Sequence, residues 1–454
     1  MTEVDSVSPS VDGIERVAKR LKSVRSRHRK GRHAEAHEAK PQDEKRRRGV
    51  KKRLFADDRV PSKDAELVDD ADGLAEVLAH LRGDDIGSPR RFAYDTEFIG
   101  ETSYHPKLCL LQVGTCEKVY LVDPLAEMDT GPLLALLVDP SIQKIVHAGE
   151  QDLEPVARLT GKVPANVIDT QIAAAFCGLP YPASLAKLVE HVSSCFMDDL
   201  GSPGGGLKLG KGYTFTQWDA RPLSSKQLAY AADDVRYLPI VLDWIEGQLD
   251  ASEERKRWMR AECDLRCQKA ADEADADPWE RLRGYGGIDD NGRPILRALA
   301  RWRDSAAREA DLPPRALVRD DVLVYLAKNP PKPGNKQRIG EIRHMPKPVA
   351  EQFGDAIMAA IDAGRDQKDD ATPDHQPYEP SLADKFAADA AWAKLQSLAY
   401  DRGLDPNLVA SRRDVEGLLR RHAEDRVRDD ELLLTGWRGE AVGQAWAAAV
   451  LSSS

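Results

Sequence analysis

Phe92-Ala-Tyr-Asp-Thr-Glu-Phe-Ile99 is the stretch from which the fold of this chain can be argued. It places two carboxylates, Asp95 and Glu97, two residues apart inside an apolar run. Side chains at positions i and i+2 of a β-strand point to the same face, so these two acids would project side by side. Strands ordinarily avoid aspartate, and two like charges held this close disfavour each other. A hard divalent cation such as Mg²⁺ is the simplest compensation, and acids merely solvated at a strand end are the alternative.

Strands and helices alternate after this stretch. The short turn Gly114–Lys118 predicts that the first three strands pair as an antiparallel meander. The later alternation predicts an α/β domain whose mixed sheet carries helices on both faces. The predicted strands are Arg91–Ile99, Leu108–Gly114, Val119–Val122, Lys144–Gly149 and Val167–Asp169, and the predicted helices that follow the last two are Asp152–Leu159 and Thr170–Cys177.

Two further acids stand where the edge of such a sheet would let them reach a common cleft. Asp152 opens a predicted helix directly after a strand, and Asp234 lies on a predicted helix from Ser224 to about Tyr237. Tyr230 precedes Asp234 by four residues, so the two share one helix face. Four acids, water and substrate phosphate oxygens would suit a pair of Mg²⁺ or Mn²⁺ ions, which can clamp the attacking and leaving oxygens at a phosphodiester.

Three segments resemble the exonuclease motifs of the DEDD superfamily, in its tyrosine subgroup: Tyr94-Asp-Thr-Glu97, His147-Ala-Gly-Glu-Gln-Asp-Leu153 and Tyr230-Ala-Ala-Asp-Asp234. Ile168-Asp-Thr-Gln-Ile-Ala-Ala174 and Trp218-Asp-Ala-Arg-Pro-Leu-Ser224 resemble ribonuclease D in particular. The resemblance covers about 65–267 and implies an RNase H-like fold that removes nucleoside 5′-monophosphates from the 3′ end of RNA.

The same resemblance implies a role for each site residue. Asp95, Glu97, Asp152 and Asp234 would hold two divalent metal ions, and Tyr230 would orient the attacking water. Single-stranded RNA 3′ ends, such as those of tRNA precursors, are the implied substrates. Phe98 or Gln151 could contact the terminal nucleotide, because aromatic side chains stack on unpaired bases.

The chain after about residue 275 is predicted to be all helical. It resembles HRDC domains, the helical modules of ribonuclease D and RecQ-type helicases. One such domain is indicated by Leu296-Arg-Ala-Leu-Ala-Arg-Trp-Arg303 with Pro313-Pro314 and Asp321-Val-Leu323. Leu408–Glu416 and Leu434–Arg438 resemble a second, more divergent HRDC-like domain. In the first of these domains Arg301, Arg303 and Arg315 could meet phosphates, although ordinary surface charges explain them equally well.

These patterns predict five segments along the chain: a basic disordered arm (1–62), an exonuclease domain (63–270), an HRDC domain (275–365), a linker (366–380) and a second HRDC-like domain (381–454). Within the arm, the residues from Met1 to Leu54 carry 17 Lys and Arg against 8 Asp and Glu, while the remaining 400 residues of the chain carry a net charge of −19. An acidic body with a basic arm indicates local phosphate-binding patches rather than a surface that binds nucleic acid throughout. The glycine-rich loop Gly201–Gly206 is longer than the corresponding segment of the family.

Composition narrows the class of protein. The chain has no apolar run of membrane-spanning length and no signal-peptide pattern, which favours a soluble cytoplasmic protein. Its six scattered cysteines make a disulfide framework unlikely for 454 residues. Two rival functions stay open at this point. One is a 3′→5′ exonuclease that acts on DNA, and the other is a catalytically inert protein that only binds nucleic acid.

Several polar neighbours of the motifs are predicted to have structural roles. Asp169 directly precedes a helix and is expected to be its N-cap. Asp233 points about 100° away from Asp234 around the helix and is expected to be solvated. His147 is expected to satisfy hydrogen bonds in the core or a loop, and Glu150 to be an acid at the start of a helix.

Overall fold

The computed structural model describes residues 60–61, 63–83, 90–100, 102–199, 209, 217–282, 288–367 and 381–453. Almost all of the predicted basic arm, the loop Gly201–Gly206 and most of the linker lie outside the described residues, so these predictions stay untested. The six cysteines form no disulfide in the part of the chain that is described. None of the described helices has both the length and the apolarity needed to cross a membrane.

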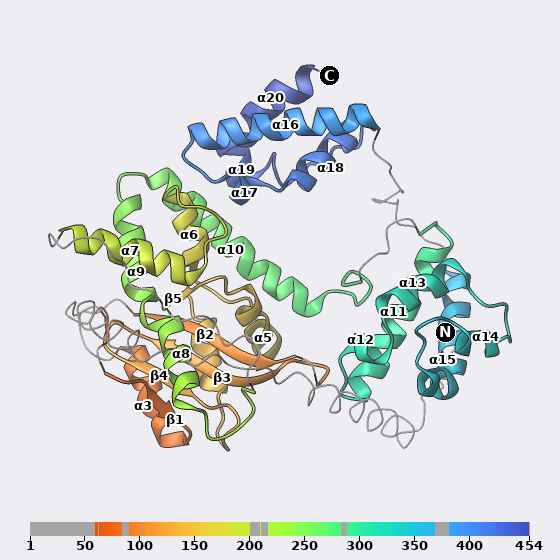
Figure 1. Cartoon of the computed structure of the whole chain (residues 1–454), viewed down its shortest axis with the longest axis horizontal. Coiled ribbons are helices and arrows are strands. Elements are labelled where there is room, and N and C mark those ends of the chain that lie inside the picture. Colours follow the sequence, from red (N-terminus) through yellow and green to blue (C-terminus); the bar gives the residue numbers. More distant parts are fainter. Residues whose placement is uncertain are drawn as a thin grey trace, which may run out of the picture. The chain divides into compact units, whose positions relative to one another are not determined.

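The chain divides into two compact units (Figure 1). We call the first the sheet unit; its described residues lie in 60–97, 108–275 and 381–453. We call the second the helical unit; its described residues lie in 98–107 and 276–367. The C-terminal segment, predicted as a separate domain, thus belongs to the same compact unit as the sheet.

The sheet has six strands in the order β1-β4-β3-β2-β5-β6. Strand β3 pairs antiparallel with β4, as predicted, whereas β1–β4, β2–β5 and β5–β6 are parallel pairs. The mixed sheet expected from the sequence is therefore confirmed. The strands are β1 (Glu66–Val68), β2 (Arg91–Ile99), β3 (Lys107–Gly114), β4 (Val119–Val122), β5 (Gln143–Val146) and β6 (Val167–Asp169).

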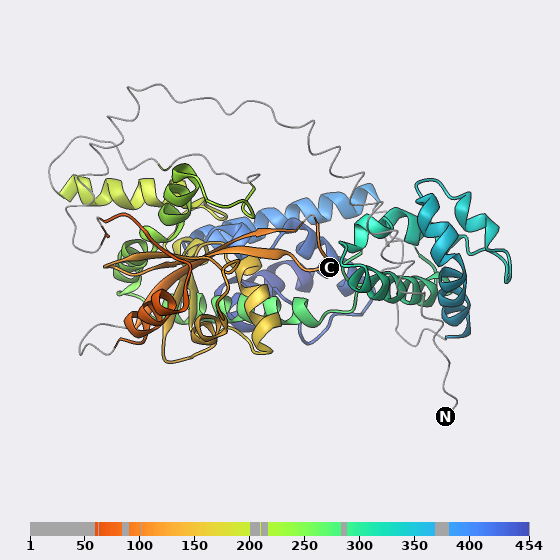
Figure 2. The same ribbon diagram turned by 90° about the horizontal axis from the view of Figure 1, so that it is seen from below.

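Helices cover both faces of this sheet (Figure 2). Phe92 and Tyr94 of β2 are buried on one face, in a core that also contains residues of α3, α4, α5 and α10. Their alternation with Asp95 and Glu97 leaves the acids on the opposite face. The helices are α3 (Ala71–Arg82), α4 (Gly131–Leu137), α5 (Glu150–Thr160), α6 (Thr170–Phe176), α7 (Leu185–Asp199), α8 (Ser225–Arg236), α9 (Leu238–Leu249) and α10 (Glu253–Asp275).

The C-terminal segment packs on α10 through buried polar contacts. Glu262 of α10 accepts from both terminal nitrogens of Arg438, over 2.6 and 2.9 Å, and from the indole nitrogen of Trp437 over 2.9 Å. Within the segment, the Trp446 indole donates to the Ala391 carbonyl. Its helices are α16 (Leu382–Asp401), α17 (Pro406–Val409), α18 (Arg412–Ala423), α19 (Gly436–Arg438) and α20 (Gln444–Val450), with a π-helical turn at Gly439–Gly443 and a 3₁₀ turn at Leu451–Ser453.

The helical unit is built on two long helices that cross closely. A Cβ on Gly364 of α15 would lie 2.5 Å from the Ile295 Cα of α11, so only glycine allows this approach. The link between β2 and β3 belongs to this unit, because the Tyr104 hydroxyl donates to Asp304 over 2.6 Å. The helices are α11 (Gly292–Glu309), α12 (Pro314–Leu317), α13 (Asp320–Lys328), α14 (Gln337–Gly340) and α15 (Lys347–Asp366).

Candidate active site

The first two acids lie on β2, the strand predicted from the opening stretch. Asp95 and Glu97 alternate with Thr96, whose side chain is buried. The Thr96 backbone N–H donates to Asp152 Oδ1 over 3.1 Å, and the Thr96 hydroxyl donates to the same oxygen. Asp152 is thereby tied to the strand at a point between the other two acids.

The turn that leads from β5 into α5 aims Asp152. Ala148 has a φ of 55°, which non-glycine residues seldom adopt. The carboxylate of Asp169 holds this turn by accepting from the backbone N–H groups of Ala148, over 3.0 Å, and Gly149, over 3.1 Å. A Cβ on Gly149 would meet the Val146 side chain at 2.7 Å, so a glycine is required there.

Helix α8 brings the fourth acid. It begins with a capping box between Ser224 and Gln227. Tyr230 and Asp234 are four residues apart on this helix, so they lie on one face about one turn apart. The end of β3 packs directly on this helix, because a Cβ on Gly114 would lie 2.7 Å from the Val235 carbonyl oxygen. The approach of sheet to helix therefore depends on a glycine.

The segment before α8 is held by one arginine. Arg221 donates to both carboxylate oxygens of Asp123 and, over 2.7 Å, to the Cys109 carbonyl. It also donates to the carbonyl of Trp218, whose buried ring lies 6.3 Å from that of Tyr230. This clamp was not foreseen from the sequence, in which Arg221 and Asp123 are 98 residues apart.

Burial and neighbouring acids raise the pKa values of the four carboxyls. Burial, followed by the charges of Asp152, Asp234 and Glu97, raises the pKa of Asp95 well above its usual range. Burial, followed by Asp234 and Asp152, raises the pKa of Glu97 to about 8. Burial is also the main cause that raises the pKa of Asp152 to about 6 and that of Asp234 to about 7. Carboxylates from β2, α5 and α8 therefore share one site.

Tyr230 stands beside these acids as a neutral phenol. Burial, followed by the charges of Asp234 and Glu97, raises its pKa above the usual value near 10. A phenol with such a pKa is protonated at neutral pH, so it can donate a hydrogen bond but does not act as a free base.

Comparison with known proteins identifies the family. Residues 65–250 match the family model for 3′-5′ exonucleases, and residues 293–361 match the model for HRDC domains. Ribonuclease D of Escherichia coli is 34% identical over 365 residues, which are 78% of this chain and 91% of that protein. The chain belongs to the ribonuclease D family. It is a 3′→5′ exoribonuclease, a hydrolase that acts on RNA, and the first HRDC domain is confirmed.

Other members of the family and solved structures agree. Ribonuclease D of Sphingobium indicum is 32% identical over 83% of this chain and 92% of its own length. The crystal structure of E. coli RNase D, described as an exoribonuclease involved in structured RNA processing, has a TM-score of 0.71 and 30% identity. It covers 86% of this chain and 99% of that one. A protein from Bifidobacterium adolescentis, with a TM-score of 0.56 and 21% identity, shares the fold.

The donor set of the site suits the divalent metal that this family implies. Four carboxylates are the hard oxygen ligands that Mg²⁺ and Mn²⁺ prefer. None of the four is ion-paired with a Lys or Arg of the described residues, and nearby acids raise the pKa values of Asp95 and Glu97. Within the described ranges, however, no three His, Cys, Asp or Glu side chains are grouped closely enough to form a ready-made metal site. Such a site would need water or substrate oxygens to complete it.

The structural roles predicted for neighbouring residues are mostly confirmed. Asp169 caps α6 by accepting from the Gln171 N–H. His147 bonds to the Thr170 hydroxyl and the Ala183 carbonyl, each over 3.0 Å. Glu150 begins α5, as predicted, and also pairs with Arg266 and Lys269 of α10.

The prediction that Asp233 is merely solvated is wrong. Its side chain is only 17% exposed and lies 3.6 Å from the Nε atom of Arg236, one turn along α8. The helix spacing that turns Asp233 away from Asp234 also brings it beside a cation.

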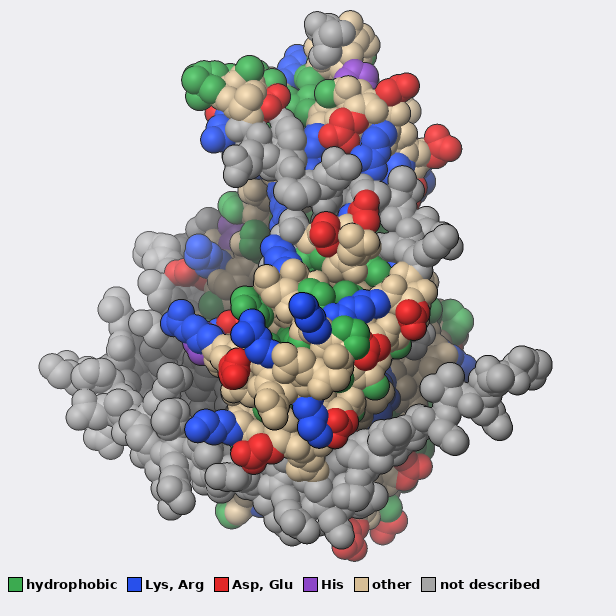
Figure 3. Space-filling model, turned by 90° about the vertical axis from the view of Figure 1, so that its right-hand side faces the viewer, with side chains coloured by type: hydrophobic (Ala, Val, Ile, Leu, Met, Phe, Trp, Pro, Cys, Tyr) green, Lys and Arg blue, Asp and Glu red, His purple; other side chains and the backbone are tan. Residues whose placement is uncertain are grey.

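The three arginines predicted to contact phosphate in the HRDC domain differ in their exposure. The prediction for Arg303 is wrong, because its guanidinium is buried and donates to Asp320 and to the Val318 carbonyl. Arg301 and Arg315 are 59% and 48% exposed, and each already pairs with an aspartate. Figure 3 shows basic and acidic side chains interspersed on one side of the molecule. Phosphate binding by Arg301 and Arg315 stays a prediction.

The two predicted nucleotide contacts lie on the elements that carry the acids. Phe98 follows Glu97 on β2 and is half-buried, while Gln151 is exposed in the first turn of α5, directly before Asp152. Both contacts stay predictions.

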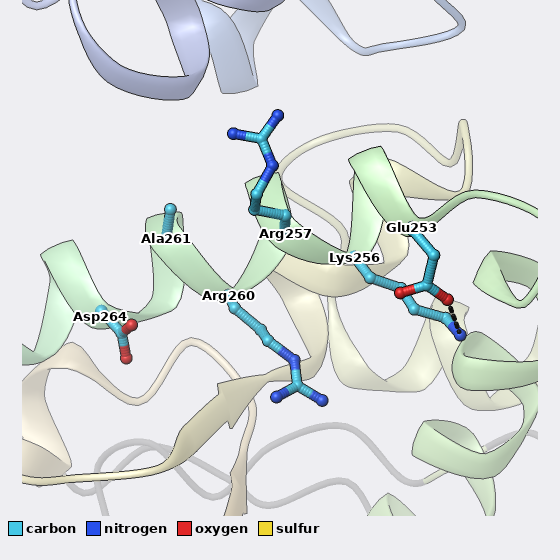
Figure 4. A pocket seen from close by; sticks show the side chains of 6 residues that line it. All are labelled: Glu253, Lys256, Arg257, Arg260, Ala261 and Asp264. Atoms are coloured by element: carbon cyan, nitrogen blue, oxygen red, sulfur yellow. Dashed lines mark hydrogen bonds and ion pairs between the residues drawn. The ribbon is translucent and has the colours of Figure 1, made fainter.

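An open pocket of about 550 Å³ lies along α10, and none of the four acids lines it (Figure 4). Two of its cations are engaged, since Lys256 pairs with Asp250 and Glu253, and Arg257 pairs with Glu440. This pocket is therefore separate from the candidate site formed by the four acids. It is lined by Glu253, Lys256, Arg257, Arg260, Ala261 and Asp264.

Proposed function

We propose that Asp95, Glu97, Asp152 and Asp234 hold two divalent cations, Mg²⁺ or Mn²⁺, and that Tyr230 orients the attacking water. The crowding of these four carboxylates, with no basic partner among the described residues, is the observation that carries the proposal. Buried like charges are costly unless a cation or a proton offsets them. When bound, the cations would activate the water and stabilise the charge that develops on the phosphate oxygens.

The protein's own side chains supply position rather than further charge. Thr96 holds the carboxylate of Asp152 through two hydrogen bonds. Tyr230 keeps its proton and donates a hydrogen bond, which orients a water without removing a proton from it. Phe98 would stack on the terminal base, and Gln151 would bond its edge or the ribose, where the 2′-hydroxyl distinguishes RNA.

We infer that the substrates are single-stranded 3′ ends of structured RNA, including tRNA precursors, in the cytoplasm. The E. coli relative is described as acting in structured RNA processing, which supports this substrate class. Arg301 and Arg315 would meet RNA phosphates from the HRDC domain, and residues 1–62 would serve as a non-specific phosphate-binding arm. Residues 381–454 would form the second HRDC-like domain, fixed on α10.

Digestion of a 3′-labelled RNA tests the proposed site. Asp95→Ala combined with Glu97→Ala should abolish metal-dependent release of nucleoside 5′-monophosphates. The matched control is Asp72→Ala with Glu76→Ala, which removes two exposed acids from α3 and should leave the rate unchanged. Unchanged activity of the Asp95/Glu97 variant would overturn the metal-site assignment.

The same assay defines the substrate. Matched RNA and DNA oligonucleotides, with and without a structured 5′ portion, should be digested in parallel. The proposal predicts faster digestion of RNA and efficient trimming of a tRNA-like molecule to its folded stem. Faster digestion of DNA would contradict the substrate class. Binding of RNA without any release of nucleotides, in either Mg²⁺ or Mn²⁺, would instead indicate an inert binding protein.

A further inference from the structure

Gln112 is a wholly buried polar residue in the middle of the sheet. It lies on β3, between β4 and β2, where it pairs with Leu121 of β4. Its neighbours Leu111 and Val113 point into the core shared with α3, α4 and α5. Alternation along the strand therefore turns Gln112 to the opposite face, the face on which Gly114 meets α8.

The carboxamide of Gln112 lies between two hydrogen-bond acceptors. With its nitrogen turned toward them, the side chain donates to the Ala231 carbonyl over 2.8 Å and to Asp95 Oδ2 over 3.1 Å. The reverse orientation would place the amide oxygen against the same two atoms and form neither bond. A backbone carbonyl can only accept, so Ala231 decides the orientation whatever the protonation of Asp95.

We propose that Gln112 is a positioning residue of the active site, because one NH₂ group joins the acid of β2 to the helix that carries Tyr230 and Asp234. The inference rests on the proposed role of Asp95 as a metal ligand. An ionised Asp95 that donates oxygen to a cation keeps one oxygen oriented by Gln112. The same NH₂ group also donates to the carbonyl of Ala231, the residue after Tyr230. It therefore fixes the position of Asp95 on β2 relative to Tyr230 and Asp234 on α8.

The chemistry of the side chain fits this role better than other residues would. A lysine or arginine would neutralise Asp95 and compete with the cation. A leucine would leave a buried carboxylate and a buried carbonyl without this donor. A neutral amide satisfies both acceptors and adds no charge, as hydrogen-bond donors behind metal ligands commonly do.

Substitution of Gln112 tests the proposal with readouts that a purely structural role would not change. Gln112→Leu should raise the dissociation constant for Mn²⁺, measured by electron paramagnetic resonance without RNA, by about tenfold or more. The Mn²⁺ concentration that half-saturates hydrolysis should rise in parallel. The kcat should fall, while the KM for a single-stranded RNA should stay within about twofold, since the wholly buried Gln112 side chain cannot touch a substrate.

Controls separate this inference from the function on which it rests. Ser193→Ala removes the hydrogen bond that another buried polar side chain donates to the Glu190 carbonyl within α7, and it should leave Mn²⁺ binding unchanged. Gln112→Met, which keeps the length of the side chain but donates no hydrogen bond, should weaken Mn²⁺ binding as well if Gln112→Leu fails to fold. Wild-type Mn²⁺ binding and kcat in a folded Gln112 variant would overturn the inference. Wild-type Mn²⁺ binding in Asp95→Asn would overturn the proposed metal site itself.

Discussion

Buried acids of the candidate active site differ from the buried acid of the docking surface in whether a cation of the chain accompanies them. The docking surface is the contact of Glu262 on α10 with Trp437 and Arg438 of the C-terminal segment. Glu262, on α10, is 1% exposed and accepts from both Arg438 and Trp437. Burial alone would raise its pKa, but the hydrogen bonds and charge of Arg438 outweigh burial and lower the pKa of Glu262. In the candidate active site, Asp152 is 8% exposed, and burial raises its pKa to about 6.

The difference recurs elsewhere. Asp123 pairs with Arg221, and Asp320 pairs with Arg303 and Arg315; the pKa of each carboxyl is lowered by these arginines despite partial burial. Each of these three structural acids, Glu262, Asp123 and Asp320, is accompanied by an arginine of the same chain. The four acids of the candidate site lack such a cation among the described residues, so a proton or the proposed metal ions would have to offset their charge.

The largest effect is expected when the active-site acids lose their charge but keep their shape. Asp95→Asn with Glu97→Gln should lower the rate of hydrolysis by roughly a thousandfold or more, equivalent to about 4 kcal/mol. The metal-free variant should melt at the same or a higher temperature than the wild type, because repulsion between carboxylates is removed. Calorimetry and a single-turnover assay measure both. A large fall in melting temperature would contradict the comparison.

The docking surface should respond in the opposite way. Arg438→Met leaves Glu262 buried without its cation, and the free energy of unfolding should fall by about 3–5 kcal/mol. Adding Glu262→Gln should restore part of this loss. The control is Arg257→Ala. It removes an exposed ion pair between Arg257, which lies on α10 like Glu262, and Glu440 of the C-terminal segment, and it should barely change the free energy of unfolding in urea. Equal losses in both variants would show that burial of the pair is unimportant.

Metal should supply the cation that the active site lacks. Mg²⁺ or Mn²⁺ at about 100 times its dissociation constant should raise the free energy of unfolding by about 2.7 kcal/mol. Removal of the metal with a chelator should reverse the gain. The Asp95→Asn/Glu97→Gln variant should show no such stabilisation, whereas Arg438→Met should gain as much as the wild type.

The smallest of these effects is expected at low pH, where the contact between Glu262 and Arg438 should contribute less to the free energy of unfolding. The pKa of Glu262 is lower in the folded chain than its ordinary value of about 4.3, so its stabilisation is complete above that pH. The stabilisation is lost as the pH falls through the folded pKa. The difference in unfolding free energy between the wild type and the Glu262→Gln/Arg438→Met variant should therefore shrink below about pH 4. A constant difference between pH 3 and pH 6 would contradict the assignment.

Local patterns were sufficient to predict much of the fold. The strand Arg91–Ile99 and the turn before Asp152 follow from alternation and from a glycine after a strand. Helix spacing placed Tyr230 and Asp234 on one face. Gln112 and Arg221 are polar residues near apolar runs of the sequence. Nothing local in the sequence indicates that Gln112 meets Asp95 or that Arg221 meets Asp123.

The sequence by itself determined which acids the chain carries, on which elements, and to which family it belongs. These properties depend on periods of two and 3.6 residues and on short motifs, which are local. Only the tertiary structure decided which acids receive a cation from the chain. Glu262 and Arg438 are 176 residues apart, and Arg303 is buried against Asp320 rather than exposed to phosphate. Such pairs arise when helices and strands pack, and packing brings together residues whose separation in the chain carries no periodic signal.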